Sequence, residues 1–265
     1  TVVAGLLCAV LLLADSAAAN AAAIDSTSVS IAINKAGRQR MLVQRMAKAW
    51  VMIGLGVQPE RGQKILNESL SRFEGQLAEL KGFAADADVR RSLVQLEREW
   101  QDYRAALRAA PGRQHAQAVY DHSELTQEAA HRLTLAYEMA SRAPADRLVN
   151  IAGRQRMLSQ RLAKFWLFQA WEVNTVAARM QLNFARAEFA SGMHQLYGTT
   201  GTSPEIGRTV EQLDHDWIAY RNVLVEKRDA TTMRRAAPEV VELSERVLAT
   251  AERLVALYES QAGAR

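Results

Sequence analysis

One segment of this chain occurs twice, at positions 116 residues apart. The first copy reads INKAGRQRMLVQRMAK over 33–48, and the second reads VNIAGRQRMLSQRLAK over 149–164. Shorter matches, at spacings of 117 and 121 residues, link 96–104 to 213–221 and 135–138 to 256–259. Self-similarity at a nearly constant spacing indicates a duplicated structural unit. The chain is therefore restricted to folds made of two similar modules.

Each module is predicted to consist of four helices. Helix-forming residues dominate the 265 residues, only 5 Pro and 14 Gly interrupt them, and no strand-like alternation of apolar and polar residues is seen. Four helices with short connections favour an up-down-up-down bundle. The predicted fold is all-α, with helices at 27–56, 62–81, 87–109 and 113–141, then 145–172, 174–197, 204–227 and 231–261.

The segment SRAP at 141–144 bears on how the two modules are arranged. The residue before a proline avoids the α region, so a turn is expected here. A turn places the first helices of the two modules side by side and parallel, as in a dimer. The alternative is a kinked continuous helix, which would stack the modules end to end. We favour the side-by-side pseudo-dimer, with modules at 24–142 and 143–265.

The N-terminal region, 1–23, is predicted to be a signal peptide. An apolar run is followed by small residues, as before a cleavage site, which we expect near 21–23. The run is shorter than the roughly 20 residues of a membrane-spanning helix; an uncleaved anchor is the alternative. The only cysteine, Cys8, lies in this run. The mature protein is therefore expected to be periplasmic, soluble and free of disulfides.

Charge and motifs argue against several classes of function. The net charge of +4 and pI near 9.4 suit a small anionic ligand, but the basic residues are interspersed, which does not favour nucleic acid. The five histidines match no zinc or di-iron motif, and neither a nucleophile elbow nor a phosphate loop is present. The prediction is a non-enzymatic protein without metal or cofactor.

On a helical wheel the repeated segment separates into two faces. An apolar stripe, expected to face the bundle core, contains Leu42, Met46, Ala49, Trp50 and Ile53, and in the second copy Leu158, Leu162, Phe165 and Trp166. The opposite face, here called the motif face, is expected to be a mixed surface away from the core. It carries Gly37, Arg40, Met41, Gln44 and Lys48, matched by Gly153, Arg156, Met157, Gln160 and Lys164, with Arg38, Arg45, Arg154 and Arg161 at its edges.

The motif face predicts an anion-binding site. If the two copies meet, Arg40 faces Arg156, and two cations about 4 Å apart repel by roughly 4 kcal/mol at an effective dielectric of about 20. A small planar oxyanion between them reverses the sign, because guanidinium groups bind such anions in bidentate fashion. The predicted ligand-binding residues are Arg40, Arg156, Gly37, Gly153, Arg38, Arg154, Gln44, Gln160, Arg45 and Arg161. The alternative is ordinary pairing with acids on neighbouring helices, for which Glu97, Glu99, Asp214 and Asp216 are available.

The string AGRQRMLxQR, present in both copies, resembles the N-terminal domain of type IV pilus methyl-accepting chemotaxis transducers, the PilJ-type domain. The string INKAGxxRM at 33–41 is similar to the periplasmic sensor domain of NarX/NarQ-type nitrate/nitrite sensor kinases. The resemblance implies four-helix bundles paired through their first helices, with an anion site to which Arg40 and Arg156 each contribute. This chain differs from the kinases in carrying two modules, and in having Arg38 and Gln39 inside the motif.

Two functions fit these observations. In the first, the protein is an exported sensor that binds a small inorganic oxyanion, nitrate or nitrite first, between the two motif faces. In the second, it is a periplasmic adaptor without its own ligand, which docks onto a membrane-bound sensor kinase or chemoreceptor; a chain without a transmembrane helix would need such a partner. The first is preferred, and its site lies either within one chain or between the chains of a homodimer.

Overall fold

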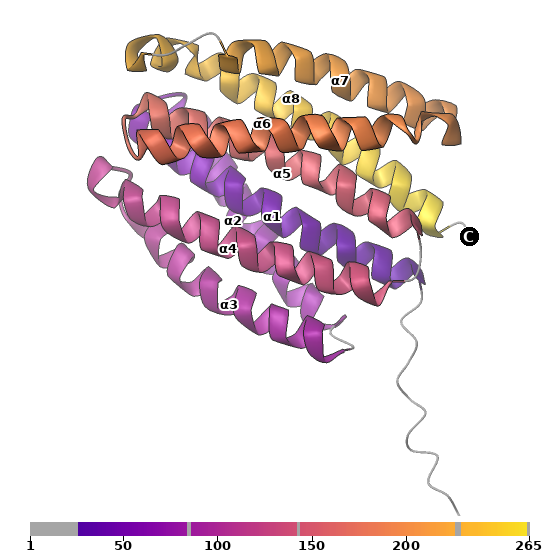
Figure 1. Ribbon diagram of the computed structural model, residues 1–265. Coiled ribbons are helices and arrows are strands. Elements are labelled where there is room, and N and C mark those ends of the chain that lie inside the picture. Colours follow the sequence, from indigo (N-terminus) through magenta and orange to yellow (C-terminus); the bar gives the residue numbers. More distant parts are fainter. Residues whose placement is uncertain (1–25, 84–85, 142–143, 226–228, 264–265) are drawn as a thin grey trace, which may run out of the picture.

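The computed structural model describes residues 26–83, 86–141, 144–225 and 229–263 (Figure 1). The predicted signal peptide at 1–23 and Cys8 lie outside these ranges. Within them the regular structure is helical: besides the short 3-10 turn η2 (Thr200–Thr202), it consists of α1 (Ser26–Leu55), α2 (Pro59–Lys81), α3 (Ala87–Arg108), α4 (Arg113–Ala140), α5 (Pro144–Ala170), α6 (Thr175–Tyr197), α7 (Pro204–Val225) and α8 (Ala230–Gly263).

Helices α1 and α5 lie side by side at the centre of the molecule and run parallel (Figure 1). The first packs on α2 and α4 of its own module, and the second packs on α6 and α8. The predicted pair of tandem four-helix bundles, arranged as a pseudo-dimer, is therefore confirmed. Among the described helices, none has both the length and the apolar character required to cross a membrane.

The duplication extends to the packing of each core. The ring of Phe73 lies against Trp100 with centroids 4.2 Å apart, and in the second module Phe189 lies 4.1 Å from Trp217. Tyr103 and Tyr220 are both fully buried, and each donates its hydroxyl hydrogen to a main-chain oxygen of the central helix of its module. These aromatic residues belong to the hydrophobic cores of the two modules.

The connections after α1 and α5 also match. Gly56 and Gln58 have positive φ values, and so do Glu172 and Asn174, which stand 116 residues later. The turn between α1 and α2 is shorter than predicted, because α2 begins at Pro59 and not at residue 62. Proline is well suited to the first helical position, because its missing N–H would have no partner there.

The motif face is buried, which corrects its prediction as a mixed surface. The side chains of Arg40, Gln44 and Lys48 in α1 are fully buried, as are their equivalents Arg156, Gln160 and Lys164 in α5. Each central helix covers the motif face of the other, with α8 and α4 closing the sides. A wheel drawn for one module omits the second module, so it could not show by itself that the second module buries this face.

Candidate functional site

The guanidinium groups of Arg40 and Arg156 converge between α1 and α5. The Nη2 atoms of both arginines lie within 4 Å of the point that a Cβ on Gly37 would occupy, and the same holds at Gly153. Glycine at these positions leaves the space that the guanidinium groups fill. The structure thus brings together the two arginines and two glycines that the sequence singled out.

Each of these arginines is held by an asparagine of the other module. Arg40 Nη2 donates to Asn150 Oδ1 over 2.7 Å, and Arg156 Nη1 donates to Asn34 Oδ1 over 2.9 Å. The asparagine amides in turn donate to acids near the ends of α4 and α8, Glu138 and Glu259. Both asparagines belong to the repeated segment, but neither was among the predicted ligand-binding residues.

A second pair of crossed contacts lies one to two turns further along the helices. Arg45 and Lys48 of α1 both contact Glu245 of α8, each with a closest distance of 2.5 Å. The equivalent Arg161 and Lys164 of α5 contact Glu124 of α4, at 2.5 and 2.6 Å. Arg45, Lys48, Arg161 and Lys164 therefore join the modules through ion pairs, as the alternative interpretation of the motif face expected.

The acids that serve this purpose are not those considered from the sequence. Glu97 pairs with Lys81, and Asp216 accepts hydrogen bonds from Gln212 and Thr250. The two motif glutamines also contact the opposite module: Gln44 Nε2 donates to Glu124 over 3.3 Å, and Gln160 Nε2 donates to the Ser244 main-chain oxygen over 3.0 Å. The 121-residue spacing between 135–138 and 256–259 also relates Glu124 to Glu245. This spacing is the sequence signal that could have identified these two acids as equivalent partners of the motif cations.

The two halves differ at one pair of equivalent positions. Glu252 of α8 forms ion pairs with Arg156 and Arg38, both at 2.9 Å. The residue 121 positions earlier is His131 of α4, whose Nδ1 lies 3.2 Å from Arg40 Nη1. Among the described residues no carboxylate forms an ion pair with Arg40. Arg154, the equivalent of Arg38, pairs instead with the partly exposed Glu188 at 2.8 Å.

This difference sets the electrostatics of the first half. Burial, together with the charges of Arg154 and Arg156, lowers the pKa of Arg40 to about 9, so the group is still cationic at neutral pH. Burial and the charges of Arg40 and Arg154 lower the pKa of His131 to about 4, so the imidazole is neutral there. In the other half, burial opposes ionisation of Glu252, but Arg156 and Arg38 outweigh it and lower its pKa to about 2.

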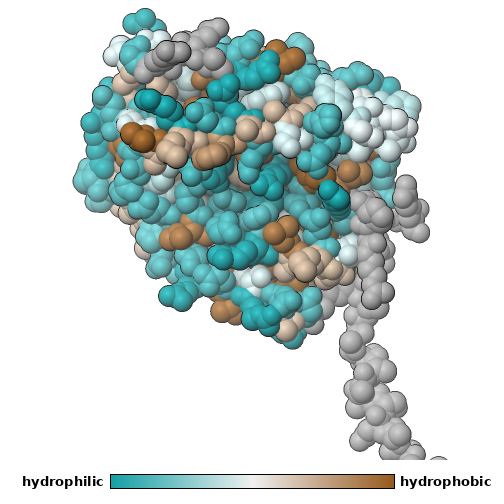
Figure 2. Space-filling model, in the orientation of Figure 1, coloured by the Kyte–Doolittle hydropathy of each residue, from teal (hydrophilic) through white to brown (hydrophobic). Residues whose placement is uncertain are grey.

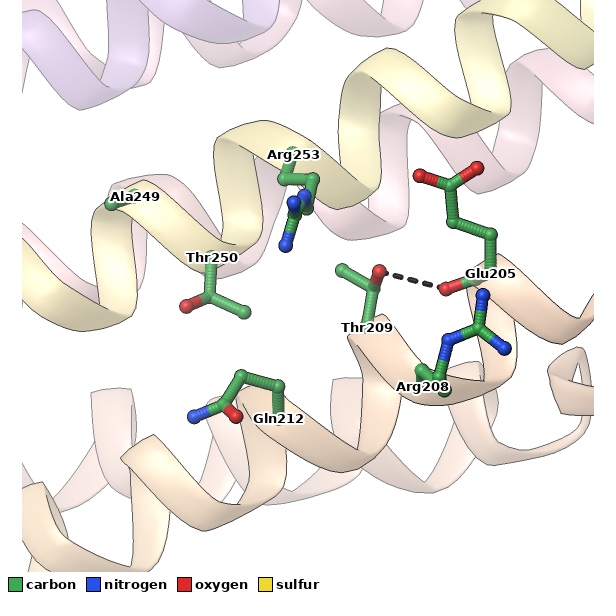
Figure 3. Close-up of a pocket in the computed structure, with 7 residues that line it drawn as sticks. All are labelled: Glu205, Arg208, Thr209, Gln212, Ala249, Thr250 and Arg253. Atoms are coloured by element: carbon green, nitrogen blue, oxygen red, sulfur yellow. Dashed lines mark hydrogen bonds between the residues drawn. The ribbon is translucent and has the colours of Figure 1, made fainter.

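A cavity of about 470 Å³ lies between α4, α5 and α6 on the Arg40 side. Arg40 and His131 line it together with Arg154 and Arg161 of the predicted site. A comparable hollow of about 490 Å³ lies between α7 and α8, but no residue of the repeated segment lines it (Figure 3). Its arginines, Arg208 and Arg253, are exposed, and the hydrogen bond drawn within it joins Thr209 to the main-chain oxygen of Glu205. The cavity beside Arg40 is therefore the better candidate.

Comparison with known families places both modules in one family. The model of the PilJ family, described as the N-terminal domain of type IV pili methyl-accepting chemotaxis transducers, matches 24–125 and again 137–260. Each match contains one copy of the repeated segment. Searches of curated proteins and of solved structures gave no match.

Proposed function

The chain belongs to the PilJ family of chemotaxis-transducer N-terminal domains, which are sensory domains, and from this premise we propose that it is an exported, non-enzymatic sensory protein that recognises a small oxyanion of the nitrate or nitrite kind. The proposed site lies at the interface of α1 and α5, on Arg40 and Arg156. The predicted ligand-binding residues surround it: Gly37, Gly153, Arg38, Arg154, Gln44, Gln160, Arg45 and Arg161.

The observation that carries this proposal is the excess of buried cationic groups over buried acids. Arg40 is enclosed without an ion pair among the described residues, and the guanidinium group of Arg156 lies close by. A buried charge without a counter-charge is costly to fold, so such a group indicates a position where an anion binds. The parallel arrangement lets one chain provide an arginine pair that a family with single modules would have to build from two chains.

Isothermal titration of the purified chain with sodium nitrate and sodium nitrite tests the proposal. We expect saturable binding that is lost in Arg40→Met plus Arg156→Met, in which the volume is kept but the charge is removed. Arg104→Met on α3 is the matched control, because Arg104 forms a partly exposed ion pair with Glu74 far from the site. Absence of binding to the parent chain, or equal binding by the double variant, contradicts the proposal.

A second function is supported by a separate observation. Val176, Met180 and Phe184 are spaced four residues apart on α6 and are 72, 55 and 60% exposed. Figure 2 shows apolar patches on this face of the molecule. An exposed apolar stripe is typical of a docking surface, which is what an adaptor for a membrane-bound sensor kinase or chemoreceptor requires. Chemical cross-linking to the purified periplasmic domain of such a receptor, with Met180→Glu as the negative variant, tests this function.

A further inference from the structure

The second module contains a carboxylate already bound to a pair of motif arginines. Arg38 Nε and Nη2 donate to the two carboxylate oxygens of Glu252 over 3.2 and 2.9 Å, and Arg156 Nη1 donates to one of them over 2.9 Å. This is the bidentate geometry that guanidinium groups form with planar anions. It shows how the arginine pair of this fold holds a carboxylate.

The first module has the same pair of arginines without the carboxylate. Arg154 and Arg40 are equivalent to Arg38 and Arg156, and His131 stands where the spacing of 121 residues would place the acid. The same spacing of 121 residues relates Glu124 to Glu245, and these two acids make matched contacts, with Lys164 and Lys48 respectively. The equivalence of His131 and Glu252 is therefore supported by the contacts of both modules.

At the position of the missing carboxylate, the side chains of Arg40, Arg154 and His131 offer hydrogen-bond donors. Arg40 is fully buried, and within the described ranges its Nε has no hydrogen-bond partner and its other contacts are the neutral Asn150 and His131. Because an arginine can only donate, His131 Nδ1 must accept from it, which puts the imidazole hydrogen on Nε2 as a further donor. Two carboxylates line the cavity, and both are on exposed or partly exposed residues, Glu128 and Glu188. Glu188 is 43% exposed and pairs with Arg154 at the rim of the cavity, where a screened ion pair is weak.

The cavity at this point is larger than an inorganic ion needs. Its volume of about 470 Å³ is in the range of small-molecule sites, roughly 300–1,000 Å³. Met157 and Phe184 line it beside the arginines, so part of its wall is apolar. A ligand with one anionic end and an organic remainder matches both parts of this lining.

We propose that the cavity between α4, α5 and α6 binds the carboxylate of a small organic acid, with Arg154 and Arg40 in the positions that Arg38 and Arg156 occupy on Glu252. The organic part of the ligand lies toward Met157 and Phe184. This inference rests on the proposed function, that the interface recognises an anion. It narrows the ligand class to organic carboxylates and places a single site on the Arg40 side.

Substitution His131→Glu tests the inference, because it supplies from the chain the carboxylate that the site lacks. The parent chain and the variant are titrated calorimetrically with sodium acetate, sodium benzoate and sodium nitrate. We expect the parent to bind benzoate most tightly, at least about tenfold more tightly than nitrate, and the variant to lose this binding while melting at a higher temperature. His131→Gln, which adds no charge and can still donate a hydrogen bond, is the comparison variant, and it weakens benzoate binding much less than His131→Glu does.

Arg154→Gln and Arg38→Gln form a second matched pair. The first removes the expected bidentate donor and weakens benzoate binding by about tenfold or more, whereas the second removes its equivalent on the occupied side and weakens benzoate binding much less. Equal binding of benzoate by His131→Glu and the parent overturns the inference. A second outcome also overturns the inference: nitrate binding that is lost equally on substitution of Arg40 or Arg156 and is unaffected by His131→Glu. That outcome leaves the proposed function standing. Absence of binding by every probe overturns both.

Discussion

Arg156 Nη1 donates to the carboxylate of Glu252 over 2.9 Å, and this contact joins the central helix of the second module to its last helix. The equivalent arginine of the first module, Arg40, meets the imidazole of His131 instead. Two halves that share their helices, turns and aromatic core therefore differ in the charge of one buried site. One arginine is neutralised by a carboxylate of the chain, whereas no described carboxylate forms an ion pair with the other.

The crossed asparagines are predicted to differ in their effect on stability. Asn150→Ala leaves Arg40 with His131 alone, whereas Asn34→Ala leaves Arg156 with Glu252. Because a hydrogen bond to a charged group contributes about 1.5–3 kcal/mol, we expect Asn150→Ala to lower the free energy of unfolding by about that amount and Asn34→Ala to lower it less. Urea unfolding followed by circular dichroism measures both values. An equal loss of unfolding free energy in the two variants would mean that Glu252 does not compensate Arg156 for the missing Asn34 hydrogen bond.

Glu245 is predicted to be needed for the pairing of the modules. Glu245→Gln leaves the buried Lys48 and its neighbour Arg45 without a counter-charge, and breaking a buried pair in this way costs about 3–5 kcal/mol. Glu242→Gln is the control, since the exposed pair of Glu242 with Arg61 is worth at most about 1 kcal/mol. Both are read from urea unfolding curves, and similar losses would show that the Glu245 contact is not specially important.

Stability is predicted to fall on acidification. Burial opposes ionisation of Glu245, but Lys48 and Arg45 outweigh it, so its pKa is lowered from 4.5 to about 2, and that of Glu252 is lowered similarly. A carboxyl group with a lowered folded-state pKa stabilises the fold above its unfolded-state pKa, and this contribution is lost as the pH falls through the folded-state pKa. The free energy of unfolding should therefore decrease as the pH is lowered from about 4.5 to about 2. In Glu252→Gln this decrease should be smaller; an unchanged slope would assign the acid sensitivity to other groups.

The glycines of the motif are predicted to respond differently from an ordinary helix glycine. A Cβ on Gly37 would lie 3.2 Å from Arg40 Nη2, inside the enclosed cluster, whereas a Cβ on Gly75 of α2 meets nothing within 4 Å. Replacing a helix glycine by alanine contributes up to about 1 kcal/mol when space allows. Thermal melts should therefore show Gly75→Ala as stabilising, with Gly37→Ala gaining less or destabilising. A gain in Gly37→Ala equal to that in Gly75→Ala would refute the crowding argument.

Some of the site could be predicted from residues 33–48 and 149–164, and some could not. Periodicity identified the apolar stripe that includes Trp50 and Trp166, both of which are buried. It also brought Arg40 and Arg156 together once the modules were placed side by side. The pairing acids were missed because Glu245 lies 200 residues from Arg45 in the chain, and a wheel describes one helix at a time.

The sequence by itself determined the duplication, the helices and which arginines recur in both modules, because these follow from local repetition, helix propensity and apolar periodicity. Only the tertiary structure decided that the motif face is an interface, that its asparagines cross between modules, and that Glu252 serves one arginine while His131 leaves the other unpaired. The physical reason is that the charge balance of a buried arginine depends on which side chain of a distant helix docks against it. That neighbour is chosen by the packing of whole modules, and local sequence does not report it.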